Sequence, residues 1–249
     1  MRKSIFAVAL AVLFLAPAQR SRATTVFTGE DVGAGPGDAT PLSSAAQASF
    51  ATAASAIGTV GLINFESAPL GSFTSLVVAP GVTISGADEF GDPLFISNTP
   101  NYPASPQLDG FNTTPGGSQY VEVTAGTLTF TFANPIQFFG AYLTGVQSPY
   151  FYQDTITFSD GTSQTIDIPG TDSGSSGAVD FVGFTDAGAS ITSVSINSGV
   201  VGPGGYGDYI GVDDVNFQVT TTPEPGSFAL VLTGILAIGC ERLRRRRRV

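Results

Sequence analysis

Short apolar segments broken by turn residues are the feature that most limits the fold of this chain. From Thr59 onward, apolar residues alternate with polar ones or form short runs, and Gly, Pro, Asn and Asp separate the runs. Glycine occurs 31 times and proline 16 times, which disfavours a helical bundle. The pattern predicts a mainly β fold, an antiparallel β-sandwich of the jelly-roll type.

Nine segments are predicted to be strands, because each is apolar at its centre and has a turn residue near one end. They cover residues 60–65, 82–85, 94–97, 120–123, 128–132, 136–143, 178–184, 191–196 and 210–219.

One hairpin can be predicted together with its register. Its loop lies between two apolar pairs, Ile156 with Phe158 and Ile166 with Ile168. A two-residue loop would place the pairs on opposite faces, which is a costly register. A three-residue loop, residues 159–161, sets Phe158 opposite Thr162 and returns all four side chains to one face. The sequence therefore predicts a three-residue loop with a bulge and with Gly161 in the left-handed conformation.

A helix is predicted ahead of the strands. Residues 24–40 are polar and rich in Gly, Asp and Thr, so we interpret them as a flexible leader. Thr40 and Pro41 suit the N-cap and N1 positions, and Gly58 suits the position after the end. The expected buried face of the helix is formed by Leu42, Ala46, Phe50, Ala53 and Ile57.

Positive charge is confined to the two ends of the chain. All ten basic residues lie before Ala23 or after Cys240, and there is no histidine. Of the 20 acidic residues only Glu224 and Glu241 lie outside residues 23–222, so this stretch carries 18 acids and no base. Such a domain has no cation with which to hold phosphates, so we expect no nucleic-acid partner. The acidic surface keeps an exported protein soluble.

The same composition excludes most catalytic chemistry. The only cysteine is Cys240, so no intrachain disulfide can form, and triads or zinc sites that need His or Cys are excluded. A glycosidase-like carboxylate pair is the one constellation left. We expect no enzyme, because no cation or imidazole is present to orient a substrate. The candidates for a weak glycan-active hydrolase are Asp154, Asp160, Asp167 and Asp172.

The N-terminus is typical of a secretory signal peptide. Arg2 and Lys3 precede an uncharged apolar run at residues 5–16, which is short for a membrane span of about 20 residues. Small residues allow cleavage after Ala18 or after Ala23. We therefore expect export by the secretion machinery.

The C-terminus has three ordered parts. Pro223, Glu224 and Pro225 form a rigid stretch, and residues 226–240 form an uncharged apolar run that suits a hydrophobic helix. A cluster of arginines follows and should remain cytoplasmic. The cluster consists of Arg242, Arg244, Arg245, Arg246, Arg247 and Arg248. A plain membrane anchor is the simpler alternative.

This tail resembles the PEP-CTERM sorting signal over about its last thirty residues. The resemblance implies recognition by an exosortase and removal of the tail near residues 223–225. It also implies a Gram-negative-type bacterium that makes exopolysaccharide. The expected location is the membrane at least transiently, and then the cell surface or extracellular matrix.

Two segments suggest a metal site. Asp213 has the parity of Val215 and Phe217, which predicts that it points toward the core and needs amides, hydroxyls or a metal ion as partners. Residues 211–217 resemble the closing strand of galactose-binding-like jelly rolls, and residues 63–66 resemble an early strand of those domains. That resemblance implies a structural Ca²⁺ held by Glu66 with Asp213 or Asp214; the alternative is a carboxylate bonded to loop amides.

Tyrosines supply a second candidate site. Tyr150 and Tyr152 precede the hairpin, and Tyr206 and Tyr209 lie in a Gly-rich segment. Their rings could stack on sugars, although half-buried tyrosines at strand ends are the commoner explanation.

These expectations define the organisation and the function classes. We predict a signal peptide at 1–23, a leader and helix at 24–58, a β-sandwich at 59–220 and a sorting or anchor tail at 221–249. The expected function is that of an exosortase-sorted surface or matrix protein with a structural or binding domain. A carbohydrate-binding module for exopolysaccharide is the main alternative, and a weak hydrolase is the third.

Overall fold

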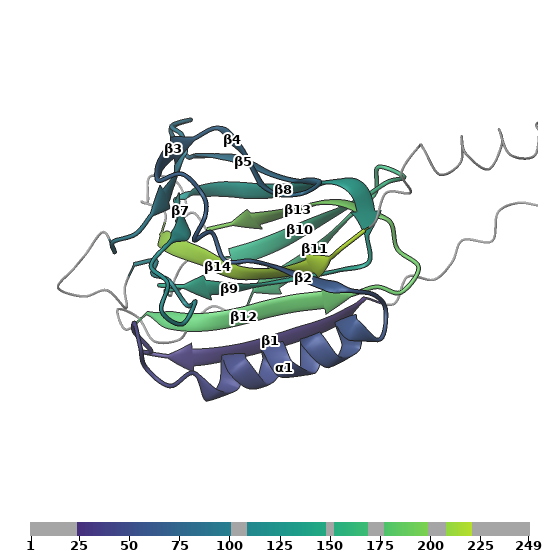
Figure 1. Ribbon diagram of the computed structural model, residues 1–249, viewed down its shortest axis with the longest axis horizontal. Coiled ribbons are helices and arrows are strands. Elements are labelled where there is room, and N and C mark those ends of the chain that lie inside the picture. Colours follow the sequence, from purple (N-terminus) through teal and green to yellow (C-terminus); the bar gives the residue numbers. More distant parts are fainter. Residues whose placement is uncertain (1–23, 101–108, 148–151, 169–176, 199–207, 221–249) are drawn as a thin grey trace, which may run out of the picture.

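Two antiparallel sheets packed face to face form the body of the protein (Figure 1). The computed structural model describes residues 24–100, 109–147, 152–168, 177–198 and 208–220. The mainly β sandwich predicted from the sequence is therefore confirmed.

The larger sheet has eight strands, and its order begins at an edge strand close to the N-terminus. The order is β1 (Thr25–Val32), β12 (Ala178–Thr185), β9 (Phe138–Thr144), β14 (Tyr209–Gln218), β7 (Tyr120–Thr124), β6 (Leu94–Ser97) and β3 (Gly71–Phe73), with β2 (Val60–Ile63) paired to β14.

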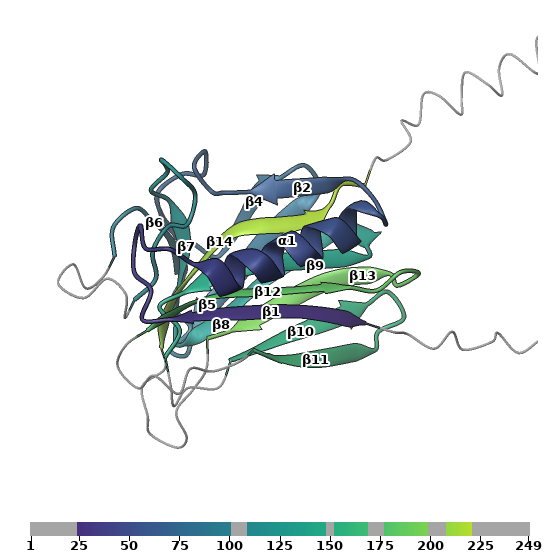
Figure 2. The same cartoon turned by 90° about the horizontal axis from the view of Figure 1, so that it is seen from below.

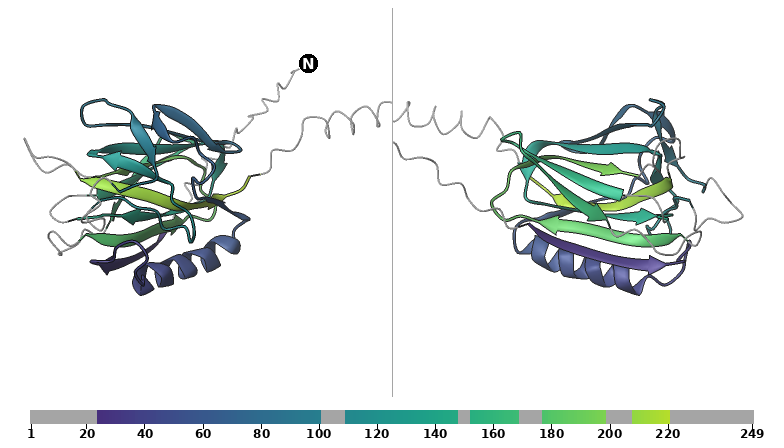
Figure 3. Two further views of the ribbon diagram at one scale, coloured as in Figure 1. Left: turned by 60° about the vertical axis from the view of Figure 1, so that its left-hand side comes forward. Right: turned by 180° about the vertical axis from the view of Figure 1, so that it is seen from behind.

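The smaller sheet has six strands and lies behind the larger one. Its order is β11 (Ser163–Ile168), β10 (Tyr152–Phe158), β13 (Ile191–Asn197), β8 (Gly126–Ile136), β5 (Val82–Asp88) and β4 (Ser75–Ala79). Figure 3 shows this sheet from behind, with the purple strand β1 and helix α1 along the lower edge of the molecule.

The main core fills the space between the sheets. Phe130 of β8 and Phe139 of β9 meet across it with ring centroids 5.1 Å apart, and Phe184 of β12 stacks on Phe139 at 5.9 Å. All three rings are fully buried. The described residues include no Lys, Arg or His, so they form no ion pairs with one another. Burial of apolar area is therefore the main term that stabilises the domain.

The predicted strands are confirmed, and three strands were not predicted. Segment 94–97 coincides with β6, and the other eight overlap observed strands. The unpredicted strands are β1, β3 and β4. Strand β3 has only three residues, and β4 pairs with β5 at the edge of its sheet.

Strand β1 corrects the prediction of a flexible leader. All eight of its residues pair with β12, from Thr25 opposite Thr185 to Val32 opposite Ala178. Its polar composition suits an edge strand with one covered face. Phe27 provides the apolar contact, because its ring packs on Phe50 at a centroid distance of 5.9 Å.

Helix α1 (Pro41–Ser55) covers the outer face of β1 and β12 (Figure 2). Phe50 is fully buried there against the rings of Phe138 and Phe181. Gly29 allows the helix to approach β1, because a Cβ at this position would lie 2.3 Å from the Leu42 carbonyl oxygen.

The helix begins as predicted, with Thr40 at the N-cap and Pro41 in its first turn, but its buried face differs in detail. Leu42 is 60% exposed, and Ala54 rather than Ala53 is fully buried, so the buried face is turned slightly from the predicted one. Thr40 occupies the N-cap position without a capping hydrogen bond from its side chain. Asp31 of β1 takes that role, because its carboxylate accepts the backbone N–H groups of Leu42 and Ser43 at 3.0 and 2.8 Å.

The β10–β11 hairpin has the predicted register. Ile156 lies opposite Gln164 and Thr157 lies opposite Ser163. Continuing this register pairs Phe158 with Thr162 and leaves residues 159–161 between them as the loop. Gly161 has a φ of 81°. The register irregularity on β10 lies on its other side, against β13.

Within the described ranges, no helix combines the length and the apolar character needed to cross a bilayer. The predicted signal peptide and the predicted hydrophobic C-terminal helix lie outside those ranges.

Candidate functional site

A β-bulge in β14 decides where its two adjacent carboxylates point. The pairing of β14 with β9 shifts between Asp213 and Asn216, and Asp214 has a φ of 44°. Asp213 therefore lies opposite Tyr142, on the outer face of the eight-stranded sheet, and not in the core between the sheets. The parity argument was wrong because the bulge adds a residue ahead of Val215 and reverses the alternation.

Asp213 is nevertheless fully buried, because the segment before β7, residues 109–119, folds over it. One carboxylate oxygen, Oδ2, accepts the backbone N–H groups of Thr113 and Thr114 at 2.8 and 3.2 Å. The Thr113 hydroxyl lies 3.1 Å from the same oxygen. Amides and hydroxyls thus supply the partners that a buried carboxylate requires.

Two glycines permit the close approach of this segment to β14. A Cβ on Gly110 would lie 2.2 Å from the backbone nitrogen of Gly211, and a Cβ on Gly211 would lie 2.5 Å from the Thr144 hydroxyl. Phe111 then forms two hydrogen bonds with the Thr144 hydroxyl, both 2.8 Å long, one as backbone donor and one as backbone acceptor. The segment is therefore fixed on the outer face of the sheet.

Glu66 holds the far end of the same segment. Its Oε1 atom accepts the backbone N–H groups of Ser118 and Gln119, both at 2.8 Å. Glu66 follows β2 directly after Phe65, which has a φ of 57°. Two carboxylates from distant parts of the sequence therefore clamp one segment between them.

The structure brings Glu66 and Asp213 together at the side chain of Asn112. The amide nitrogen of Asn112 lies 2.9 Å from Glu66 Oε1, 2.9 Å from the Gln119 carbonyl oxygen and 3.1 Å from Asp213 Oδ2. An amide NH₂ has two hydrogens, so three oxygens converge on a group that can satisfy two of them. The Asn112 amide nitrogen occupies the centre of this arrangement.

The surroundings of Asp213 disfavour the charged form of its carboxyl group. Its Oδ1 atom is buried without a hydrogen-bond partner. Burial raises the pKa of the Asp213 carboxyl to about 7, and the adjacent Asp214 carboxylate adds to the rise. The described residues contain no group of three His, Cys, Asp or Glu side chains that could hold a metal ion.

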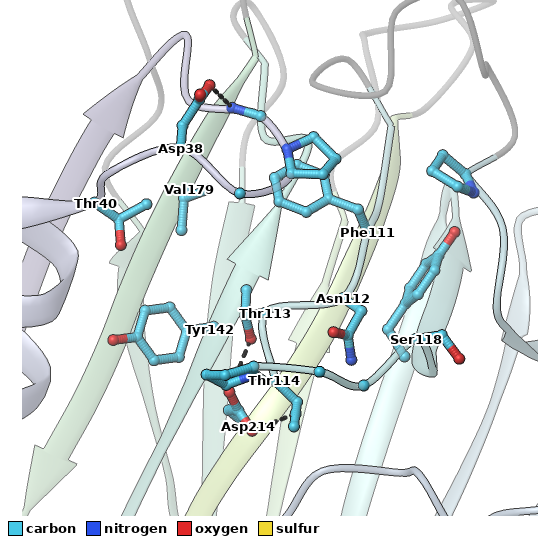
Figure 4. Close-up of a pocket in the computed structure, with 18 of the residues that line it drawn as sticks. Asp38, Thr40, Phe111, Asn112, Thr113, Thr114, Ser118, Tyr142, Val179 and Asp214 are labelled. Atoms are coloured by element: carbon cyan, nitrogen blue, oxygen red, sulfur yellow. Dashed lines mark hydrogen bonds between the residues drawn. The ribbon is translucent and has the colours of Figure 1, made fainter.

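A pocket of about 690 Å³ opens beside this segment (Figure 4). One wall is the connection between β1 and α1, and the other wall is the segment from Phe111 to Ser118. The floor is the outer face of the eight-stranded sheet, where Tyr142 and Asp214 lie. The lining includes Asp38, Phe111, Thr113, Thr114, Tyr142 and Asp214.

Aromatic rings give the pocket its apolar surface. Tyr142 is half-buried and packs edge-on against Phe181 at a centroid distance of 5.2 Å. Burial raises the pKa of the Tyr142 phenol. Tyr120 donates its hydroxyl hydrogen to the Thr99 carbonyl at 3.0 Å, and burial raises its pKa to about 12. Both phenols therefore stay neutral at physiological pH.

The tyrosines nominated from the sequence do not form this pocket. Tyr209 is 41% exposed on β14, Tyr152 lies in β10 of the other sheet, and Tyr150 and Tyr206 lie outside the described residues. The pocket residues were missed because they come from six separate parts of the chain. The run from Asn112 to Ser118, which is polar and rich in glycine between two apolar segments, was the available signal.

Comparisons with known proteins give only weak likenesses. No family model and no curated protein matches the sequence. Among solved structures, the K2 adhesin domain of Lys-gingipain aligns with a TM-score of 0.38 and 17% identity over 65% of this chain and all of that one. The carbohydrate-binding module TmCBM61, solved with β-1,4-galactotriose, gives 0.31 and 14% over 63% and 95%. A family 29 carbohydrate-binding module gives 0.29 and 11% over 67% and 99%. Likenesses this weak carry no functional argument.

Proposed function

We propose that the chain is an exported surface or matrix protein whose sandwich binds a glycan in the pocket on the outer face of the eight-stranded sheet. The observation that carries this proposal is the pocket itself. Its volume of about 690 Å³ lies in the range of sites that enclose small ligands, about 300 to 1,000 Å³.

The chemistry of the lining supports a sugar as the ligand. The half-buried ring of Tyr142 offers apolar surface, and Thr113, Thr114 and Ser118 add hydroxyl and backbone groups around it. A sugar ring presents apolar faces and a rim of hydroxyls, so it matches a lining of both kinds. The described residues offer no cation, which disfavours phosphate-bearing ligands and nucleic acid.

A glycan array of the purified full chain in detergent tests this proposal. We expect binding to at least one oligosaccharide family. The variant Tyr142→Leu, which removes the ring but keeps apolar bulk against Phe181, should weaken that binding about tenfold or more, in the range measured when an aromatic contact is lost. Tyr142→Phe, the matched control, should retain most of the binding. Absence of binding, or equal binding by the leucine variant, would remove the proposal.

We propose a role without catalysis for the same pocket. An oligosaccharide that binds should be recovered intact after long incubation with the chain. Hydrolysis that disappears on substitution of a single carboxylate, such as Asp154→Asn or Asp167→Asn, would instead support the hydrolase alternative.

We also propose a structural Ca²⁺ held by Glu66, Asp213 and the Gln119 carbonyl, which displaces the Asn112 amide nitrogen on which these oxygens converge. The convergence of three oxygens on one amide nitrogen, together with the orphaned Oδ1 of Asp213, supports it. These oxygens are hard ligands of the kind that Ca²⁺ takes, and a bound ion would supply the positive charge that the domain lacks. The alternative is the hydrogen-bonded arrangement without a metal.

Thermal unfolding with Ca²⁺ and with a chelator, at matched ionic strength, distinguishes a bound Ca²⁺ from the metal-free, hydrogen-bonded arrangement. A ligand that binds only the native state adds about 2.7 kcal/mol at a hundredfold excess over its Kd, so we expect a higher midpoint with Ca²⁺. Asp213→Asn should abolish the difference, whereas Glu89→Gln, at an exposed acid remote from the site, should keep it. Equal midpoints for the unsubstituted chain would remove the metal.

A further inference from the structure

Two carboxylates lie on different walls of the pocket. Asp38 comes from the connection between β1 and α1, and Asp214 comes from β14. In Figure 4 Asp38 lies near the top of the view and Asp214 near the bottom, and the Tyr142 ring, seen nearly face-on, lies above and to the left of Asp214. Any ligand in the pocket therefore meets negative charge from two directions.

Asp38 is exposed and Asp214 is partly buried, and their hydrogen bonds differ from those of the acids that hold backbone segments in place. Asp213, Glu66 and Asp31 each accept two backbone N–H groups. Asp214 instead interacts with the hydroxyls of Thr114 and Thr113, at 2.7 and 3.1 Å.

The two hydroxyls at Asp214 are shared, and Asp38 accepts a single backbone N–H. Each of the hydroxyls also lies within 3.4 Å of Asp213, and a hydroxyl has one hydrogen to give. Asp38 accepts the N–H of Gly35 at 2.9 Å. A carboxylate has about four acceptor positions, so both groups keep capacity for a ligand that donates.

Covering these carboxylates with a neutral ligand has an energetic cost. A carboxylate that loses water needs a compensating charge or several donors. The protein provides no such charge, because its described residues contain no Lys, Arg or His. A ligand that brings its own cation removes the penalty, and it also gains attraction from an aromatic face such as that of Tyr142.

We propose that the pocket selects a glycan unit with a free amine, namely an unacetylated 2-amino-2-deoxyhexose. This inference rests on the proposed glycan binding and adds the substrate class. Amines of different sugar units of one oligosaccharide pair with Asp38 and with Asp214, and a sugar ring packs on Tyr142. The same charges reject uronates, sulfated sugars and phosphosugars.

Calorimetric titration of the full chain in detergent tests the proposal with three probes of equal length. These are the tetramer of glucosamine, its fully N-acetylated counterpart and cellotetraose. At about 0.15 M salt, where the Debye length is about 8 Å, remote charges are largely screened. We expect the glucosamine tetramer to bind at least about tenfold more tightly than either neutral tetramer, both with calcium and with chelator.

Three variants locate the effect. Asp214→Asn and Asp38→Asn should each remove most of the preference for the amine while leaving the affinity for a neutral tetramer unchanged. Asparagine tolerates the positive φ of residue 214, so the fold should be retained, and the thermal midpoint checks this. Glu89→Gln removes one exposed negative charge elsewhere and should leave the preference intact.

Each other outcome has a defined meaning. If a neutral tetramer binds as tightly as the amine, the proposed selectivity is wrong and glycan binding stands. If Glu89→Gln weakens amine binding as much as Asp214→Asn does, the attraction comes from net charge and the pocket proposal fails. If no tetramer binds but a lysine-rich peptide does, both the selectivity and glycan binding are overturned.

Discussion

Asp180 of β12 is the residue whose environment is least favourable for its charge. It lies opposite Leu143, on the face of the eight-stranded sheet that covers the main core, and it is 1% exposed. Neither of its carboxylate oxygens has a hydrogen-bond partner. Burial, together with the nearby charges of Glu30 and Asp31, raises the pKa of Asp180 to about 8. The folded protein therefore holds a proton here that the unfolded chain releases near pH 4.

This proton makes stability depend on pH in a defined direction. Between the unfolded pKa of 3.8 and the folded pKa of about 8, the native state binds more protons than the unfolded state. The free energy of unfolding attributable to Asp180 is thus fully present below pH 4 and is lost as the pH rises toward 8. We expect the thermal midpoint to fall between pH 5 and pH 8, by the equivalent of at least about 1.4 kcal/mol, which is one pKa unit.

Asp180→Asn checks the assignment, because it removes the titration and keeps the shape. Its midpoint should fall less over the same pH range, because only the titration of Asp213, whose pKa is raised to about 7, remains, and the control Glu89→Gln should follow the unsubstituted chain. If all three curves fall in parallel, other groups govern the pH dependence.

At the scale of elements, Phe50 is the largest side chain by which α1 packs on the sheet. Phe50 contacts Phe27, Phe138 and Phe181 at centroid distances of 5.9, 6.1 and 5.5 Å. Phe50→Ala should lower the free energy of unfolding by about 3 to 5 kcal/mol, as for other buried phenylalanines. Leu42→Ala, at the 60% exposed position that the sequence placed on the same face, should change it by less than about 0.5 kcal/mol. Urea unfolding measures both, and similar losses would contradict the observed helix orientation.

Most elements could be predicted because their apolar pattern is local. Strand β6 and the β10–β11 register follow from alternation and from one glycine turn. Strand β1 could not be predicted in this way, because its partner β12 and its cover α1 decide its structure, and Phe27 is the only aromatic ring in it. The orientation of Asp213 could not be predicted either, because a single bulge reverses the alternation after it.

The candidate sites also differ in how far the sequence predicts them. The joining of Glu66 and Asp213 was anticipated from the two strand resemblances, and the structure brings them together at Asn112. The pocket was not anticipated, because its walls come from connections whose positions depend on the whole fold. The nominated tyrosines rested on composition and on position near turns, which do not fix a shared surface.

At the scale of the whole molecule, the segregation of charge predicts the side of the membrane on which the sandwich lies. Alkaline phosphatase, fused after Thr220 in place of the tail, should be active because residues 1–23 export it. Deletion of residues 1–23 should abolish the activity. An active cytosolic reporter at the same fusion point, such as β-galactosidase, would contradict export.

The tail makes a separate prediction. In cells that contain an exosortase, mass spectrometry of the full chain should find it cut near residues 223–225, and changing Pro223, Glu224 and Pro225 to alanine should leave it uncut. An uncut chain in both cases would indicate a permanent anchor.

The central claim is that the outer-face pocket binds a glycan. A crystal structure of the chain with the tightest-binding oligosaccharide from the array tests this most directly. We predict a sugar ring against Tyr142, with donors directed to Asp38 and Asp214. Electron density for the sugar elsewhere, for example beside Tyr209, with an empty pocket at Tyr142, would contradict it.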